Sequence, residues 1–316
     1  MTNQKTDKDE INLSKLALEY ADPESARRLL ESLRWPDGIT CPHCDCKGHY
    51  VLNPRKTSKS PSRKGLYKCK TCWRQFTVTV GTVMEDSKIP LNKWLMAYFI
   101  IGSSKKAISS NQLHRMLGVA LKTAWFMSHR IRHSMKPNNP LGNLLKGVVE
   151  VDETFFGGKS DVKRSKSSKS CVAALVERGG EVRTRVVASV TQKNMGKCIR
   201  ELVDKNAIIN TDSHSAYLQL ADFKGHDVVS HSTEGFNKTT PEGRRASVNN
   251  CESFFSLMKR GIVGAFHHVS KEHLHRYCDE FAFRWNTRKL TDGERFQTAI
   301  GLVGGKRLKY RETIAA

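Results

Sequence analysis

The sequence predicts a multi-domain protein in which a small zinc ribbon and a helix-turn-helix precede a larger α/β domain. Two C-x-x-C pairs lie near the N-terminus, three helical segments follow, and strand-like and helical segments mix beyond Gly147. At 316 residues the chain exceeds the usual size of one domain. We therefore expect an N-terminal helical segment (1–36), a zinc ribbon (37–84), a helix-turn-helix unit (88–138), an α/β domain (145–300) and a basic C-terminal tail (301–316).

The charge of the chain indicates its class of partner. Lys and Arg number 53 against 31 Asp and Glu, a formal net charge of +22 that repels itself unless a polyanion is bound. Nucleic acid is the leading partner, and a basic protein without one is the alternative. An anionic membrane is disfavoured because the sequence shows no basic amphipathic helix and no lipidation signal.

Localisation is predicted from the N-terminus, the hydropathy and the cysteines. The first twenty residues lack the apolar run of a signal peptide. The longest apolar stretch, 95–101, is far shorter than the roughly 20 residues of a membrane span. Nine cysteines, an odd number, favour thiols and metal ligands over a disulfide framework. We expect a cytoplasmic, nucleoid-associated protein.

A short helix and then two cysteine pairs open the chain. Residues 14–34 carry Leu and Ala at helical spacing and end before Pro36, which predicts a packing helix. Each C-x-x-C pair can place two thiolates on one tetrahedral Zn²⁺, and 24 residues separate the pairs. Segments at 49–53, 67–69 and 73–80 resemble ribbon strands. The predicted ligands of this structural zinc are Cys41, Cys44, Cys69 and Cys72.

Two alternatives to this ligand set remain open. A redox role is the alternative for either C-x-x-C pair taken alone. Cys46, His43 and His49 lie close enough to replace a ligand, Cys44 above all.

Three helical segments between Pro90 and Met135 predict the DNA-binding unit. Gly118 provides the tight turn that a helix-turn-helix needs before its third helix. That helix is basic and would lie in a DNA groove. An ordinary three-helix bundle with solvated basic residues is the alternative. The predicted DNA contacts are Lys122, Thr123, Arg130 and Arg132.

The α/β domain begins with a β-branched, alternating run, residues 147–158, that predicts a strand carrying Asp152. Glu150 shares its face, whereas Glu153 points away. Two apolar runs, a helical stretch and a short strand follow, and Asp212 lies just beyond that strand, where side chains of an α/β sheet meet the crevice. Three strands, helix, strand, helix is the order of a ribonuclease-H-like fold.

The third acid lies on a predicted amphipathic helix, residues 247–261. Cys251, Phe254, Phe255 and Met258 recur at helical spacing and would pack on the sheet, which leaves Glu252, Ser256 and Lys259 on another face. Glu252 and Lys259 are two turns apart, roughly 10 Å along the axis. A carboxylate at a metal and an ammonium on the adjacent phosphate are therefore both within reach.

These acids suit metal-dependent phosphoryl transfer. The reaction uses two divalent ions about 4 Å apart, and carboxylates supply the hard oxygen ligands that Mg²⁺ prefers. Asp152 would bridge two Mg²⁺ or Mn²⁺ ions, while Asp212 and Glu252 would each hold one. Taken singly, each acid could equally be a cap, a turn residue or a surface charge, and Asp212 is also a fair helix N-cap.

Several motifs together resemble the ISXO-type insertion-sequence transposases. They are CPHC, CKTCWRQFTVTVGT, VEVDETFFGGK, TDSHSAY, NNCESFFSLMKRGIVGAFHHVS and YCDEFAFRWNTR, and the resemblance covers roughly residues 20–300. It implies an Asp-Asp-Glu metal triad of Asp152, Asp212 and Glu252, followed by the basic Lys259. It also implies binding to terminal inverted repeats, cleavage at 3′ ends, and strand transfer into target DNA by a homo-oligomer on double-stranded DNA.

Three questions stay open at this point. Asn249 or Asn250 could replace Glu252 as the third ligand, because related transposases can carry Asn there. A zinc-ribbon transcription regulator without catalysis would explain the charge, the zinc and the helices, but not the spaced acids. A ribonuclease-H-like nuclease would use the same metal chemistry with water as the only nucleophile.

Overall fold

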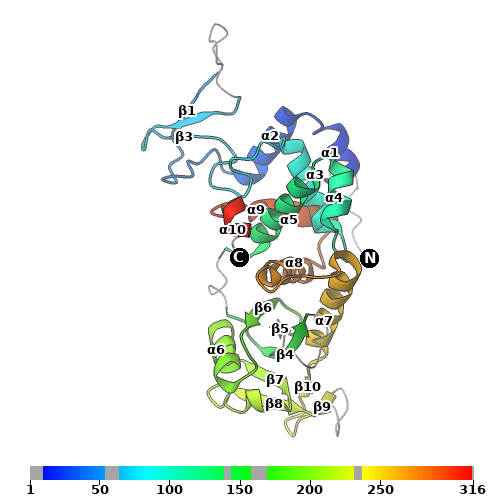
Figure 1. Cartoon of the computed structure of the whole chain (residues 1–316). Helices are drawn as coiled ribbons and strands as arrows, with labels where there is room; N and C mark the ends of the chain where they lie inside the picture. The colour runs from blue at the N-terminus through cyan, green and yellow to red at the C-terminus, as the bar shows by residue number, and fades with distance from the viewer. Residues whose placement is uncertain (1–9, 54–63, 139–143, 158–168, 231–236, 315–316) are drawn as a thin grey trace, which may run out of the picture. The chain divides into compact units, whose positions relative to one another are not determined.

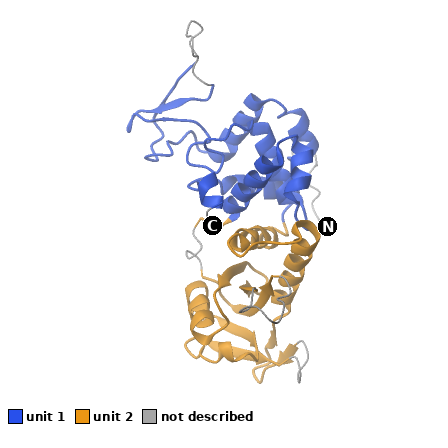
Figure 2. Cartoon of the chain, viewed as in Figure 1, with its two compact units in different colours: residues 1–135, 290–316 blue, residues 136–289 orange. Residues whose placement is uncertain are grey.

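The computed structural model describes residues 10–53, 64–138, 144–157, 169–230 and 237–314. They form two compact units, residues 1–135 with 290–316 (unit 1) and residues 136–289 (unit 2) (Figures 1 and 2). The expected boundary at residue 300 is therefore wrong, because the chain returns to unit 1 from residue 290 onward. The predicted loops around 55–65 and 157–170 lie largely outside the described residues.

Unit 1 begins with two helices where the sequence predicts one. Helix α1 spans Leu13–Leu18 and α2 spans Pro23–Arg34. Asp22 starts α2 because its carboxylate accepts from the backbone N–H groups of Glu24 and Ser25, and Pro23 fits the first helical position. The ribbon strands follow as an antiparallel sheet: β1 (His49–Val51), β2 (Tyr67–Cys69) and β3 (Gln75–Phe76).

The three predicted central helices are found: α3 (Leu91–Ser103), α4 (Ser110–Leu117) and α5 (Leu121–Met135). Gly118 follows α4 in the left-handed conformation, φ +57°, which a residue without a Cβ adopts at little cost. Two C-terminal helices, α9 (Asp292–Gly301) and α10 (Tyr310–Ile314), complete the unit. Phe296 of α9 packs on Phe99 of α3, with ring centroids 6.1 Å apart. Contacts of α9 with α3 and α2, and of α10 with α5, place residues 290–316 in unit 1.

Unit 2 is built on a five-stranded mixed sheet with the spatial order β6-β5-β4-β7-β8. Its strands are β4 (Val148–Phe156), β5 (Ser170–Glu177), β6 (Val182–Val187), β7 (Ile208–Asp212) and β8 (Gly225–Val229). The first three are antiparallel neighbours, whereas β7 pairs parallel to β4 and β8 parallel to β7. The predicted order of three strands, a helix and a further strand is therefore found.

Helices cover both faces of this sheet (Figure 1). Helix α6 (Gln192–Leu202) buries Met195, Ile199 and Leu202 against Val149 and Val151 of β4. Helix α7 (Asn249–Gly261) packs on β4 and β5 of the other face, and α8 (Leu274–Asn286) packs on β6. The smaller elements are η1 (Ser215–Tyr217), a β9 (Asn237–Thr239) and β10 (Arg245–Ser247) hairpin, and the π-helical turn η2 (Ile262–Phe266).

Two consequences of the sequence pattern are visible in these helices. Cys251, Phe254, Phe255 and Met258 are buried, as their helical spacing predicts, while Glu252, Ser256 and Lys259 are exposed. Among the described residues, no helix combines the length and the apolar character needed to cross a bilayer.

Candidate active site

The two predicted aspartates lie at the same end of neighbouring parallel strands. Glu150 of β4 is the register partner of Asn210 of β7, and the aspartates come two residues later on each strand. Because side chains alternate with a period of two, Asp152 and Asp212 share one face of the sheet at the same level. This is the face on which α7 packs.

Asp152 is half-buried and has three acidic neighbours. Burial raises the pKa of the Asp152 carboxyl to about 7, and the charges of Glu153, Asp212 and Glu252 add to the rise. The backbone N–H of Glu153, 2.8 Å from Oδ1 of Asp152, opposes it. The three predicted triad acids therefore act on one another electrostatically, although 40 and 100 residues separate Glu252 from the two aspartates.

Glu252 reaches this region from the first turn of α7, and Lys259 lies in the last turn. Cys251 connects the helix to β4, because its Sγ donates to the carbonyl oxygen of Glu150 at 3.2 Å. Asp212 ends β7, and its carboxylate accepts from the backbone N–H of His214 at 3.0 Å. The sheet thus presents two carboxylates and the helix presents the third.

The acids do not form a tight cluster. Within the described part of the chain, the one group of His, Cys, Asp and Glu whose ligand atoms all lie within 4.8 Å of one another is the cysteine set. Repulsion among like charges opposes a closer approach of the carboxylates. The donor chemistry of the site, oxygen atoms with excess negative charge, nevertheless suits a hard divalent cation.

The two asparagines before Glu252 have different surroundings. Asn250 is engaged by Glu150, since its backbone N–H and its Nδ2 donate to that carboxylate at 2.7 and 2.9 Å. The Oδ1 atom of Asn249 is buried and has no hydrogen-bond partner among the described residues. Asn249 therefore remains the alternative to Glu252, whereas Asn250 is occupied.

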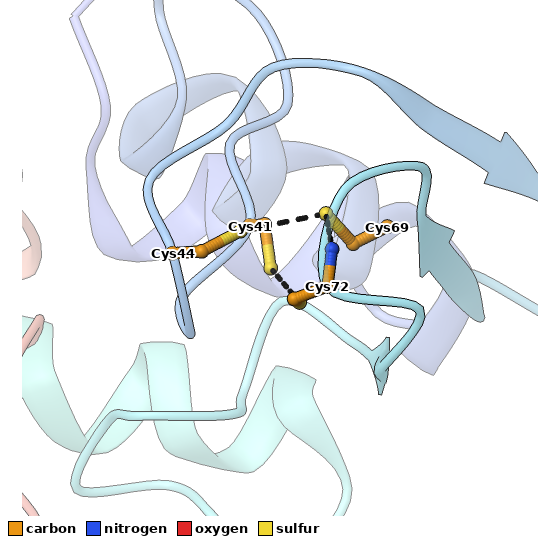
Figure 3. A group of neighbouring side chains, drawn as sticks. All are labelled: Cys41, Cys44, Cys69 and Cys72. Atoms are coloured by element: carbon orange, nitrogen blue, oxygen red, sulfur yellow. Dashed lines mark hydrogen bonds between the residues drawn. The ribbon is translucent and has the colours of Figure 1, made fainter.

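The four predicted zinc ligands do converge (Figure 3). Sγ of Cys41 lies 3.7 Å from Sγ of Cys72, and Sγ of Cys44 lies 3.5 Å from Sγ of Cys69. Tetrahedral Zn–S bonds of about 2.3 Å require sulfurs about 3.8 Å apart, so the set fits zinc. Backbone N–H groups of Cys72 and Thr71 hold the pKa of the Cys69 thiol at about 6, which favours the thiolate.

The predicted DNA contacts on α5 divide into two pairs. Lys122 is exposed and Thr123 half-buried at the start of the helix. Arg130 and Arg132 are 5% and 1% exposed. Arg130 donates to the carbonyl of Glu85, and Arg132 donates to Ser128 of its own helix at 3.1 Å. We therefore correct the prediction for both arginines, because a buried guanidinium cannot contact a DNA groove.

Two further acids, Glu150 and Glu153, lie next to Asp152 and were assigned no role from the sequence. Glu150 is fully buried and accepts five hydrogen bonds. Glu153 lies on the opposite face, as predicted, and accepts from the hydroxyl of Tyr217. An acid at a buried position of an apolar strand was the available signal for Glu150, because such a group needs partners.

Comparison with known proteins finds two domain families and one curated relative. Residues 144–286 match the ISXO2-like transposase domain, and residues 21–75 match the transposase zinc-ribbon domain. A protein of Halobacterium salinarum, described as an uncharacterized protein in transposable element ISH50, is 26% identical over 307 residues, which is 89% of this chain and 97% of its own length.

Two solved structures have a low similarity to this chain. The Mos1 strand transfer complex covers 61% of this chain and 70% of its own, at 12% identity and a TM-score of 0.28. A pre-cleavage Mos1 transpososome covers 64% and 76%, at 13% identity and a TM-score of 0.26. The sequence matches, which span both the cysteine set and the acidic sheet, decide the assignment. Residues 144–286 are thus similar to the ISXO2-like transposase domain, and residues 21–75 to the transposase zinc-ribbon domain.

Proposed function

We propose that this DNA transposase cleaves the 3′ ends of its insertion sequence and joins them to target DNA, with Asp152, Asp212 and Glu252 as its metal ligands. The observation that carries the proposal is the shared position of the aspartates at the ends of β4 and β7, with Glu252 close enough to raise the pKa of Asp152. The sheet order and its two parallel pairings, β4 with β7 and β7 with β8, support a ribonuclease-H-like fold for unit 2.

The three carboxylates would hold two Mg²⁺ or Mn²⁺ ions. Such ions activate the attacking oxygen and stabilise the leaving oxygen of an in-line displacement. Asp152 would contribute to both ion positions because the charges of Asp212 and Glu252 both act on its carboxyl group. Lys259, exposed on the last turn of α7, would neutralise a phosphate next to the scissile one.

DNA binding is proposed from the charge and the exposed basic residues. A net charge of +22 favours double-stranded DNA, both as transposon ends with terminal inverted repeats and as target, at the nucleoid. Lys122 and Thr123 remain proposed contacts at the start of α5, in a helix-turn-helix formed by α4, Gly118 and α5. Joining two ends requires a homo-oligomer on the DNA.

Zinc would hold the ribbon together and take no part in the chemistry.

The deciding experiment mixes the purified protein with DNA that carries its candidate ends, a plasmid target and Mg²⁺. Products joined to the plasmid support a transposase, cleavage without joining indicates a nuclease, and binding without either indicates a regulator. Asp152→Ala should lose cleavage and joining and keep end binding. Full activity of Asp152→Ala would refute the assigned mechanism.

A further inference from the structure

We propose that Glu150 is a positioning residue that fixes the N-terminus of α7, and with it Glu252, relative to Asp152. The inference rests on the proposed function, because it concerns the geometry of the proposed metal site. Glu150 is 0% exposed and lies two residues before Asp152 on the same face of β4. Burial of a carboxylate costs several kcal/mol in desolvation alone, and its hydrogen-bond partners must offset this cost. The identity of these partners therefore indicates the role of Glu150.

The partners of Glu150 come from three separate parts of unit 2. Oε1 accepts from Nη2 and Nε of Arg178 at 2.8 and 3.3 Å, from Ser247 Oγ at 3.1 Å and from Asn250 Nδ2 at 2.9 Å. Oε2 accepts from the backbone N–H of Asn250 at 2.7 Å. Arg178 follows β5, Ser247 ends β10, and Asn250 is the second residue of α7. One carboxylate therefore joins the central strand to the segment that leads into the helix.

Arg178 extends this connection. Its Nη1 donates to the carbonyl of Arg245 at 2.7 Å and its Nη2 also donates to Ser247 Oγ at 3.1 Å. The carboxamide of Asn210, the register partner of Glu150, lies 3.3 Å from the Ser247 carbonyl. The ion pair thus neutralises Glu150 and holds β10 in place immediately before α7. A neutralised, fully engaged carboxylate is a poor metal ligand, which separates the role of Glu150 from that of Asp152.

Helix α7 has no cap of its own. Its N-cap residue, Val248, has no side chain that can accept a hydrogen bond, so the first backbone N–H groups need acceptors from elsewhere. Glu150 supplies one from the sheet, and its negative charge also suits the positive end of the helix dipole. In α7, Asn250 and Glu252 are two residues apart, about 3 Å along the axis. In β4, Glu150 and Asp152 are about 7 Å apart. Loss of the hydrogen bonds between Glu150 and Asn250 would therefore let Glu252 shift relative to Asp152, because both residues lie close to these bonds.

The test compares Glu150→Gln with a control that weakens unit 2 elsewhere. Ile199→Ala serves as the control, because Ile199 is a buried residue of α6 and belongs to the hydrophobic cluster on the opposite face of the sheet. Mn²⁺ binding to the full-length, zinc-loaded protein is followed by electron paramagnetic resonance, at a temperature where circular dichroism shows every variant folded. Partners that orient metal ligands affect metal affinity by about 10- to 100-fold. The midpoint of this titration is the Mn²⁺ concentration at which half of the sites are filled. We expect the Mn²⁺ midpoint of Glu150→Gln to rise by about tenfold and that of Ile199→Ala to stay unchanged.

Two further readouts bear on positioning rather than stability. Strand transfer at saturating DNA should show a lower kcat in Glu150→Gln, with the affinity for end DNA unchanged. Hydrogen exchange should accelerate at the first turn of α7 and not at α6. If Glu150→Gln does not fold, Arg178→Met removes the ion pair and leaves the Glu150 contacts to Asn250, and it should shift the Mn²⁺ midpoint in the same direction.

The outcomes separate this inference from the proposed function. An Mn²⁺ midpoint and a kcat of Glu150→Gln equal to wild type, with Asp152→Ala inactive, would overturn the positioning role alone. Equal shifts in Glu150→Gln and Ile199→Ala would also overturn it, because they would trace to lost stability. Full activity of Asp152→Ala would instead remove the proposed metal site on which the inference depends.

Discussion

Replacing Arg130 by methionine should weaken unit 1 and leave DNA binding intact, contrary to what the sequence alone predicts. The guanidinium of Arg130 lies 5.5 Å from the ring centroid of Trp94 and 5.1 Å from that of Phe126. It also donates to the carbonyl of Glu85, at the end of the ribbon segment. Methionine keeps most of the side-chain volume, so the substitution removes the charge and the donor while preserving the packing.

The expected loss follows from these contacts. A hydrogen bond from a charged donor contributes about 1.5–3 kcal/mol, and a cation over an aromatic ring about 0.5–2 kcal/mol. Burial lowers the pKa of Arg130, which shows that desolvation of the charge offsets part of this gain. The net destabilisation of unit 1 should therefore be about 2 kcal/mol.

Urea unfolding of the zinc-loaded chain measures that loss, and end-DNA binding at several salt concentrations measures the charge contacts. Lys122→Ala is the matched comparison because Lys122 is exposed on the same helix. Removal of one phosphate contact lowers the slope of log K against log salt by about 1. We expect that change for Lys122→Ala and none for Arg130→Met. An Arg130→Met protein with wild-type stability and a reduced salt slope would refute the burial argument.

Three further predictions concern the metal sites and the sheet. Cys69→Ser should lose zinc and unfold the ribbon, which zinc analysis and circular dichroism would detect; retained stoichiometric zinc would contradict the ligand assignment. Glu252→Gln should abolish Mg²⁺-dependent joining while Asn249→Ala keeps it, and the reverse pattern would make Asn249 the third ligand. Burial lowers the pKa of His226, so its contribution to stability is present above its unfolded pKa of about 6.5 and is lost as the pH falls through the lower folded value. His226→Gln should therefore lose less stability than wild type between pH 7 and pH 5 in urea titrations, and parallel curves would count against this.

Local patterns were sufficient to predict most elements of the fold. The alternation in residues 148–156 and the helical spacing of Cys251, Phe254 and Met258 are short-range signals, and both predicted the correct element. The helical spacing also predicted the buried face of α7. The two C-x-x-C pairs predicted the convergence of four thiols for the same reason, because each pair is a local knuckle. Strand β3 is shorter than the alternation in residues 73–80 suggests, since turns follow Phe76.

Features that depend on distant residues were not predictable in this way. Arg130 and Lys122 lie in the same basic helix, and only the tertiary positions of Trp94 and Glu85 show that one is buried. Glu150 could be placed on the face of Asp152 from the sequence. Its anchoring role requires Ser247 and Asn250, about 100 residues later, to return to the strand.

The discontinuity of unit 1 has a consequence for biosynthesis. Unit 2 lies between the two chain segments of unit 1, and Phe296, which packs on Phe99, belongs to the second segment. During synthesis the whole of unit 2 emerges from the ribosome before α9 does, so the larger, earlier segment of unit 1 remains without α9 and Phe99 remains uncovered by Phe296 until then. A nascent chain arrested before residue 290 should therefore contain a folded unit 2 beside an incomplete unit 1, and the helices around Phe99 are where a chaperone would be expected to bind.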